Sequence, residues 1–160
     1  MTSKAAPAVD DATPAPQVDH FGIVVRDLAA ALAFYRDAMG CDVTDPVVRE
    51  GQGITKAYVR FGNMQVELIA PTVAESPIKH VLEDHNASDF LARNPGGGLH
   101  HVCYAVPDLL ATRDDLVRRG YRMLGTSGVV TGGAGAPISF LDPANADGVL
   151  IELKQATPAT

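Results

Sequence analysis

The feature that most constrains the fold is a repeat that relates the two halves of the 160-residue chain. Residues 20–28 correspond to residues 101–109, and the histidine, aspartate and final leucine of this segment recur 81 positions later. A Val-Glu-Leu stretch around Glu67 recurs as Ile-Glu-Leu around Glu152, 85 positions later. Such self-similarity indicates two copies of one supersecondary unit, which bury their apolar faces together. Each copy opens with a histidine and closes with a glutamate.

Each half is predicted to have the element order βαβββ, with strands recognised by their β-branched and apolar content. Asp27 and Asp108 are the predicted N-caps of the two helices, which end near Gly40 and Gly120. Two such modules packed about a pseudo-twofold axis predict an α+β fold in which a curved sheet surrounds a cleft. The predicted strands are residues 18–26, 42–49, 54–61 and 64–70 in the first half, and 99–106, 121–125, 138–141 and 149–154 in the second.

The chain is expected to form one compact domain with polar ends, because 46% hydrophobic content is sufficient for a core. Between the modules, Ser76 and Pro77 are the predicted cap and first residue of an insert helix, which places Val81, Leu82 and His85 on one face. The expected division is a disordered leader at 1–17, one domain at 18–155 and a tail at 156–160, with module one at 18–70, the helical insert at 71–98 and module two at 99–155.

The composition limits the kinds of molecule that the protein is expected to bind and the compartment in which it is expected to work. A net charge of −6 argues against nucleic acid or an anionic membrane as the main partner. The two cysteines are too few and too far apart for a disulfide scaffold, and no apolar stretch approaches the ~20 residues that span a bilayer. The N-terminus has no signal-peptide pattern, so a cytoplasmic location is expected.

The repeat also predicts a site. A lone buried histidine is usually a hydrogen-bonded core residue and a lone strand glutamate usually faces solvent, but the agreement of residue type, element and spacing in both halves favours a shared site. His20, Glu67, His101 and Glu152 are therefore expected to converge near the pseudo-twofold axis. Two imidazoles and two carboxylates suit a divalent ion such as Co²⁺, Mn²⁺, Ni²⁺, Zn²⁺ or Fe²⁺. Four protein ligands on an octahedral ion leave two positions for a substrate with two oxygens.

Two neighbouring side chains complicate this assignment. Gln65 shares a strand face with Glu67 and also offers an oxygen, but the repeat favours Glu67 because Gln65 corresponds to Leu150. His100 is expected to point away from His101, where a surface position or an indirect hydrogen bond is the simpler role.

With the paired βαβββ units and the two His and two Glu residues, the chain resembles the vicinal oxygen chelate superfamily, also called glyoxalase-like. Within it, several segments resemble methylmalonyl-CoA epimerases, and the resemblance covers nearly all of residues 18–155. By this resemblance His20, Glu67, His101 and Glu152 fall on metal-ligand positions. The segments that carry it are residues 19–25, 61–63, 76–78, 97–101 and 148–153.

The resemblance implies a metal-dependent epimerase or isomerase of an acyl-CoA, such as methylmalonyl-CoA or a related 2-substituted malonyl thioester. The implied reaction is a 1,1-proton transfer through a metal-chelated enolate, which needs acid and base groups on both faces of the reacting carbon. Glu50, Gln52 and metal-bound Glu152 are the candidates for proton transfer.

The sequence departs from the family pattern on the substrate side. Gly51 stands where the family has a catalytic glutamate, with Glu50 one position early, and Ala134 stands where a histidine is usual. A one-residue shift in a loop could restore Glu50 to the reaction, whereas in a strand it would turn the side chain away.

Other readings within the superfamily stay open. A glyoxalase-type enzyme, similar to lactoylglutathione lyases, would use the same enediolate stabilisation. A non-catalytic small-molecule-binding member is favoured by the glycine at position 51 and disfavoured by the retention of all four ligand types. A ring-cleaving dioxygenase is disfavoured by the fourth ligand. By analogy of fold, a homodimer is also expected.

Overall fold

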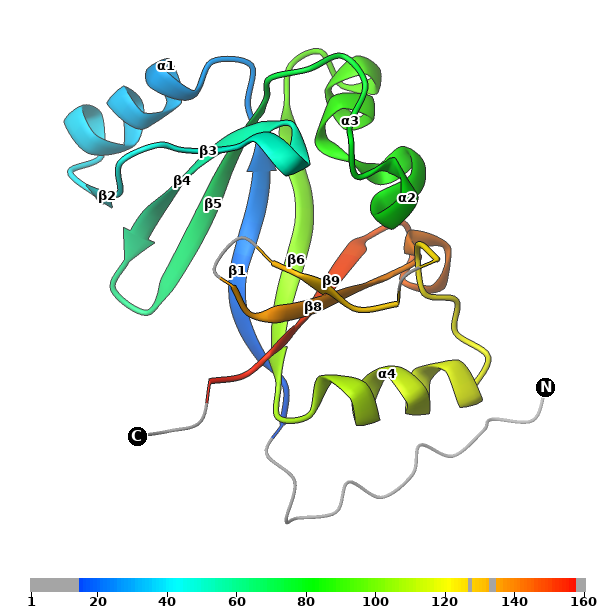
Figure 1. The fold of residues 1–160 in the computed structure, drawn as a ribbon. Helices are drawn as coiled ribbons and strands as arrows, with labels where there is room; N and C mark the ends of the chain where they lie inside the picture. Colours follow the sequence, from blue (N-terminus) through cyan, green and yellow to red (C-terminus); the bar gives the residue numbers. More distant parts are fainter. Residues whose placement is uncertain (1–14, 127, 133–134, 158–160) are drawn as a thin grey trace.

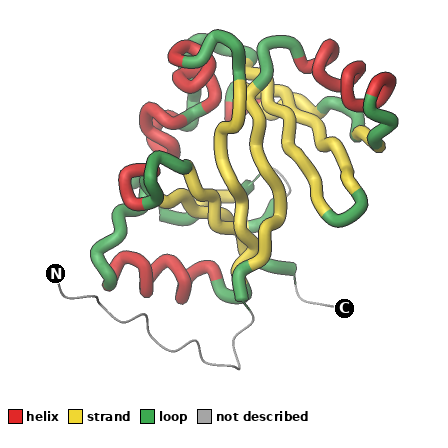
Figure 2. Tube along the Cα trace, turned by 180° about the vertical axis from the view of Figure 1, so that it is seen from behind, coloured by secondary structure: helices red, strands yellow, loops and turns green. Residues whose placement is uncertain are grey.

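A single curved β-sheet joins both modules (Figure 1). The computed structural model describes residues 15–126, 128–132 and 135–157. Its strand order is β2-β4-β5-β1-β6-β9-β8-β7, and β3 also pairs with β4. The central strands β1 (Gln17–Val24) and β6 (Gly98–Val106) are antiparallel and lie side by side (Figure 2). Each has the last strand of its own module as a parallel neighbour, β5 (Met64–Pro71) for β1 and β9 (Leu150–Gln155) for β6. This mirrored order confirms the predicted α+β fold.

In module one, the helix begins as predicted after Asp27, whose side chain accepts a hydrogen bond from the Ala30 amide at 2.9 Å. It runs as α1 (Leu28–Ala33) and then widens into a π-helical turn (Phe34–Ala38) that the sequence did not predict. Leu28 and Leu32 pack on the module-one strands. Strand alternation places this core on one face and the site on the other.

The predicted strand at 42–49 is wrong as a single element. It forms β2 (Asp42–Val43) and β3 (Val47–Arg49), because Pro46 has no amide hydrogen for the ladder. The hairpin of β4 (Ile54–Phe61) and β5 forms as predicted around residues 62–63.

In module two, Asp108 caps α4 (Leu109–Arg118) in the same way, accepting from the Ala111 amide at 2.9 Å. The sheet continues through β7 (Val130–Thr131) and β8 (Pro137–Leu141). The predicted strand at 121–125 is wrong, because the structure has there only an isolated bridge between Met123 and Leu141.

The 121–125 segment still bonds to β8 and the residue after it, since the Leu124 amide donates to the Phe140 carbonyl at 2.8 Å and the Asp142 amide to the Arg122 carbonyl at 3.0 Å, while its last residue contacts the insert. The Gly125 amide donates to Glu83 Oε1 at 3.2 Å, and a Cβ at Gly125 would lie 2.6 Å from the Val81 carbonyl oxygen. Gly125 also has φ +74°, which suits a glycine in a turn.

The insert itself is two helices, α2 (Lys79–Leu82) and α3 (Ala87–Arg93), joined by a 3₁₀ turn (Glu83–His85). The predicted cap at Ser76 is wrong, since α2 begins three residues later without a side-chain cap. Asn86 caps the second helix by accepting from the Asp89 amide at 3.1 Å, a signal that the sequence analysis missed. Val81 and Leu82 are buried against module two.

The structure describes the ends of the chain only in part. Most of the expected leader, residues 1–14, and the last residues of the tail, 158–160, lie outside the described residues, as does Ala134. The expected division into leader, domain and tail therefore stays a prediction. In the described part of the chain, no helix has the length and apolar content needed to cross a bilayer.

Candidate metal centre and acyl pocket

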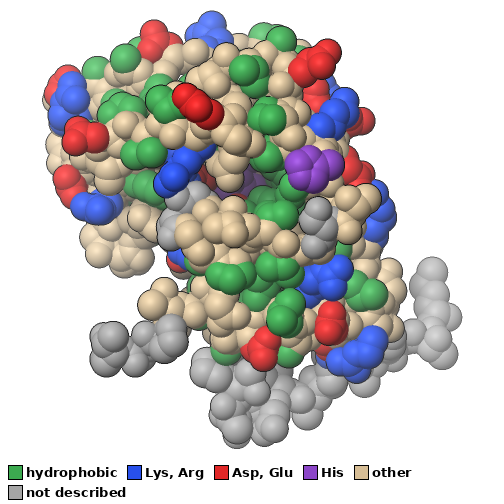
Figure 3. All heavy atoms as spheres, viewed as in Figure 1, with side chains coloured by type: hydrophobic (Ala, Val, Ile, Leu, Met, Phe, Trp, Pro, Cys, Tyr) green, Lys and Arg blue, Asp and Glu red, His purple; other side chains and the backbone are tan. Residues whose placement is uncertain are grey.

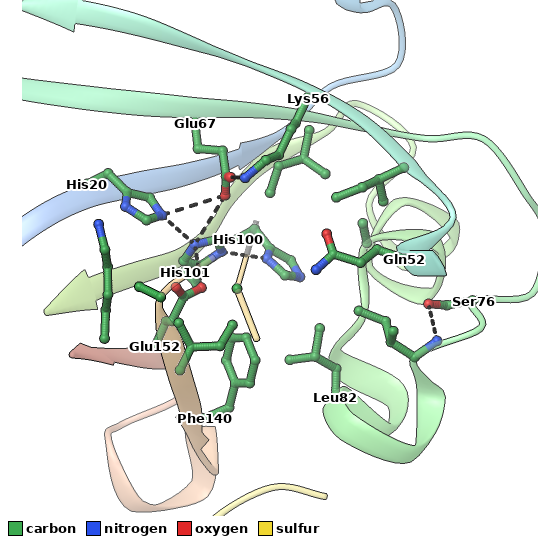
Figure 4. A pocket seen from close by; sticks show the side chains of 18 of the residues that line it. His20, Gln52, Lys56, Glu67, Ser76, Leu82, His100, His101, Phe140 and Glu152 are labelled. Atoms are coloured by element: carbon green, nitrogen blue, oxygen red, sulfur yellow. Dashed lines mark hydrogen bonds and ion pairs between the residues drawn. The ribbon is translucent and has the colours of Figure 1, made fainter. Parts of the chain in front are cut away.

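Two histidines and two glutamates meet at the junction of the modules (Figure 4). His20 Nε2 lies 3.3 Å from His101 Nε2 and 3.6 Å from Glu67 Oε2. His101 Nε2 lies 3.8 Å from Glu67 Oε2 and 3.5 Å from Glu152 Oε2. All four side chains are buried. The structure thus brings together the four residues that the repeat singled out.

Strand register explains why these positions coincide. Gly22 pairs with Glu67 across β1 and β5, and the equivalent Cys103 pairs with Glu152 across β6 and β9. In each module the histidine lies two residues before that pair, on the same strand face. Gln65 is directly opposite His20, but among the described residues that line the cavity Glu67 is present and Gln65 is not.

The four side chains stand at the floor of a cavity of about 80 Å³. Both modules and the insert contribute to its wall, with Ile54 from β4, Leu82 from the insert and Phe140 from β8. The space-filling view shows a hollow between the two halves in which histidine atoms are visible (Figure 3). A mostly apolar wall with a polar floor suits a short acyl group that carries oxygens.

The expected orientation of His100 is wrong, because β6 contains a β-bulge. Gly22 pairs with His101 and Ile23 pairs with Leu99, so His100 is an extra residue in its strand. Its ring is buried, lines the cavity and places Nδ1 2.9 Å from Nδ1 of His101. The expected indirect hydrogen bond is present, although the strand alternation that suggested it does not hold here.

β1 carries the equivalent bulge. Val18 pairs with Tyr104 and His20 with Cys103, so Asp19 is the extra residue. Asp19 Oδ1 lies 2.7 Å from Nδ1 of His20. Burial disfavours a charged His20 ring, but its interactions with Asp19, Cys103 and Glu67 together outweigh burial and raise the pKa of His20 to about 12 in the metal-free protein.

Lys56 and Tyr58 belong to the site, and the sequence analysis missed both. The Lys56 ammonium forms an ion pair with Glu67 Oε1 (Figure 4), and the Tyr58 hydroxyl donates to the same oxygen at 2.9 Å. Burial alone would raise the pKa of Glu67, but the His20 hydrogen bond and the Lys56 charge hold that pKa well below its usual range. A lysine within an apolar strand that pairs with the strand of Glu67 was the available signal.

At Glu152 and His101, burial decides the direction in which the pKa shifts. Desolvation, together with the Glu67 charge, raises the pKa of Glu152 to about 7. Desolvation and the nearby His100 lower the pKa of His101 to about 3, so His101 is neutral at ordinary pH. A neutral imidazole is the form that binds a metal ion.

The ligand atoms fit a divalent ion. Metal bonds of about 2.1 Å place neighbouring ligands of an octahedral ion about 3 Å apart, close to the observed 3.3–3.8 Å separations. Ligand atoms of His20, His101 and Glu152 all lie within 4.8 Å of one another. Glu67 reaches both histidines with Oε2 while Lys56 occupies its other oxygen.

The two proton-transfer candidates beside residue 51, Glu50 and Gln52, differ in their access to the cavity. Both belong to a 3₁₀ turn (Glu50–Gln52), in which successive side chains point about 120° apart. Gln52 lines the cavity and points toward the histidines (Figure 4). Glu50 is exposed and lines a neighbouring surface hollow with Val48 and Thr131, whereas Gln52 borders both that hollow and the cavity. The structure therefore brings Gln52, and not Glu50, to the site.

Comparison with known proteins agrees with this geometry. The chain is 39% identical over 139 residues to the ethylmalonyl-CoA/methylmalonyl-CoA epimerase of Cereibacter sphaeroides, covering 87% of this chain and 97% of that protein. It is 36% identical to the mitochondrial methylmalonyl-CoA epimerase of Homo sapiens, covering 88% of this chain and 74% of that protein.

A crystal structure of methylmalonyl-CoA epimerase from Mycobacterium tuberculosis superposes with a TM-score of 0.75 at 31% identity, covering 88% of both chains. A methylmalonyl-CoA epimerase in complex with methylmalonyl-CoA and NH4+ gives a TM-score of 0.74 at 30% identity, covering 89% of this chain and 96% of that one. Residues 19–140 match the glyoxalase/bleomycin resistance protein/dioxygenase superfamily. The chain therefore belongs to that superfamily and, within it, is similar to methylmalonyl-CoA epimerases.

Proposed function

We propose that the protein is a metal-dependent acyl-CoA epimerase that inverts the α-carbon of methylmalonyl-CoA or a related 2-substituted malonyl thioester. The observation that carries this proposal is the buried set of two histidines and two glutamates at the floor of an acyl-sized cavity. The epimerase class is supported by the curated relatives, and the acyl-CoA class by the related epimerase in complex with methylmalonyl-CoA.

His20, Glu67, His101 and Glu152 are the residues that would hold the ion. When bound, a divalent ion (Co, Mn, Ni, Zn or Fe) supplies positive charge that favours the enolate form of the substrate. The apolar cavity wall excludes water, which strengthens that electrostatic effect. The Lys56 ammonium lies in the same wall, where its ion pair with Glu67 Oε1 helps to position that carboxylate.

Proton transfer in this site falls to residues that face the cavity. Glu152 is the favoured base among the three candidates, because its carboxyl lines the cavity whereas Glu50 does not and Gln52 carries no carboxyl. Gln52 has no titratable proton and is proposed to orient the substrate by hydrogen bonding from the opposite side. Glu50 would need the 3₁₀ turn to rotate before it reached the cavity.

The direct test is exchange of the α-proton. Methylmalonyl-CoA is incubated in D₂O with metal-loaded protein and, in parallel, with protein stripped by a chelator, and deuterium at C2 is followed by NMR. We expect exchange with the loaded protein only. No exchange by protein that binds stoichiometric metal would overturn the epimerase proposal and favour a binding role, whereas exchange unaffected by the chelator would overturn the metal dependence.

Two variants in the 3₁₀ turn test whether Gln52, and not Glu50, takes part in the reaction. Gln52→Ala should lower the exchange rate at least ~10-fold, since it removes a side chain from the cavity. Glu50→Gln is the matched control and should stay within about twofold of wild type, because Glu50 lies outside the cavity. Abolished exchange in Glu50→Gln with metal still bound would instead make Glu50 the base.

A further inference from the structure

We propose that Asp19 and His100 are positioning residues that fix the ring tautomers of His20 and His101, one through a carboxylate and the other through a neutral imidazole. This inference rests on the proposed metal site and concerns how its two histidine ligands are prepared. Asp19 and His100 are 81 positions apart, so they are equivalent residues of the two modules.

The backbone provides the same device twice. Each of the two residues is the extra residue of a β-bulge in the β1–β6 pair, and each directly precedes a ligand histidine. A bulge turns its extra residue out of strict alternation, so consecutive side chains can reach the same side of the sheet. Both extra residues use that freedom to contact Nδ1 of the following ring, at 2.7 Å for Asp19 and 2.9 Å for His100.

In module two, the hydrogen-bond directions follow from a backbone carbonyl. His100 Nε2 lies 2.7 Å from the His85 carbonyl oxygen, and a carbonyl only accepts, so His100 Nε2 carries the hydrogen. The other nitrogen of the neutral His100 ring is then an acceptor. His101 must therefore donate from Nδ1, which leaves the lone pair of its Nε2 directed at His20, Glu67 and Glu152.

The His85 carbonyl is itself held by the insert. His85 ends the 3₁₀ turn just before Asn86, which is fully buried and donates from Nδ2 to the Glu83 carbonyl oxygen at 2.8 Å. The Phe90 ring contacts the His100 ring edge-on, with centroids 5.2 Å apart. The insert thus connects to the candidate ligand His101 through His100, beyond covering the cavity.

In module one, the Asp19 carboxylate selects the same tautomer for the His20 ring. A carboxylate only accepts, so His20 donates from Nδ1 to Asp19 Oδ1, and Asp19 Oδ2 accepts from the Lys154 ammonium at 2.8 Å. When the His20 ring is neutral, its Nε2 lone pair therefore also faces the site. The two modules therefore present the same nitrogen to the site through chemically different partners, a carboxylate and an imidazole.

The decisive experiment compares His100→Leu with His100→Gln. The leucine removes both hydrogen bonds, whereas the glutamine amide can accept from His101 Nδ1 and donate to the His85 carbonyl. Zn²⁺ affinity of chelator-stripped protein is measured by calorimetry, and the His101 tautomer of the metal-free protein by ¹⁵N NMR. His80→Leu, at an exposed position on the insert, is the matched control.

We expect His100→Leu to weaken Zn²⁺ binding about 10–100-fold and to give a mixture of His101 tautomers, with His100→Gln within about threefold of wild type. Unchanged Zn²⁺ affinity and an unchanged His101 tautomer in a folded His100→Leu would overturn the proposal, as would equal losses in the two variants. The tautomer readout needs no metal, so it tests this inference even if the wild type binds no Zn²⁺ and the metal site fails.

Discussion

Glu67 of module one and Glu152 of module two occupy equivalent strand positions, but different side chains face them. Tyr58 is directly opposite Glu67 in the β4–β5 pair, and Phe140 is directly opposite Glu152 in the β8–β9 pair. The tyrosine hydroxyl donates to its glutamate at 2.9 Å, whereas the phenylalanine ring only excludes water.

The residues two positions before Tyr58 and Phe140 also differ, one being charged and the other apolar. Lys56 in β4 neutralises Glu67, while its counterpart Ile138 in β8 is apolar, and both line the cavity. The pKa of Glu67 is held below its usual range by the His20 hydrogen bond and the Lys56 charge, whereas desolvation raises that of Glu152 to about 7. A duplicated backbone can thus place two carboxylates alike, while their neighbours decide which one binds protons at neutral pH.

The largest effect is expected from removing the Lys56 charge. Lys56→Met should lower the free energy of unfolding of the metal-free protein by about 3–5 kcal/mol, because it leaves the buried Glu67 carboxylate without its ammonium partner. A bound divalent ion would restore a positive charge, so added metal should raise the melting temperature of this variant more than that of wild type. Chemical denaturation and melting curves with and without metal measure both effects.

The matched change in module two is Ile138→Met, which should cost less than about 1.5 kcal/mol because it conserves volume and alters no charge. Equal losses for Lys56→Met and Ile138→Met would show that packing, not charge, distinguishes the two sides.

A smaller effect is expected from pH acting on Glu152. Its pKa is raised in the folded protein from the ordinary 4.5 to about 7, so its contribution to stability is fully present below pH 4.5 and is lost as pH rises through 7. Glu152→Gln mimics the protonated form and should be more stable than wild type at pH 8 by on the order of 3 kcal/mol, with little difference at pH 4.5. Denaturation of metal-free protein across this range measures it.

Glu67→Gln should show no such gain at pH 8, because the lowered pKa of Glu67 makes its ionised form the stabilising one above pH 4.5. Parallel pH profiles for wild type and Glu152→Gln would contradict the contrast between the two carboxylates.

The smallest effect concerns Gly22 and Cys103, the equivalent residues that pair with the two glutamates. A Cβ at Gly22 would lie 2.1 Å from the His101 ring, so Gly22→Ala should displace that ring, lower the free energy of unfolding by about 1–3 kcal/mol and weaken metal binding. Cys103→Ala displaces no ring, although it removes a thiol that donates to Glu152 Oε1 at 3.5 Å, and should cost about 1 kcal/mol. Melting curves and metal calorimetry on both variants test this prediction. Equal metal affinity in the two variants would show that Gly22 is not needed to position the His101 ring for metal binding.

Much of this molecule follows from local signals in the chain. The repeat at 81 positions predicted the mirrored modules and the convergence of His20 with Glu67, and Asp27 and Asp108 predicted both helix starts. These predictions hold because capping, turn preference and alternation depend on residues close together in the sequence.

The tertiary structure alone decided the surroundings of the four candidate ligands. The bulge that brings His100 to His101 exists only because β6 pairs with β1, and Lys56 reaches Glu67 only because β4 pairs with β5. Hydrogen bonds and charges across strands depend on register between distant segments, which no local pattern encodes. The sequence by itself therefore determined which side chains could bind a metal, and long-range strand pairing decided their tautomers and charges.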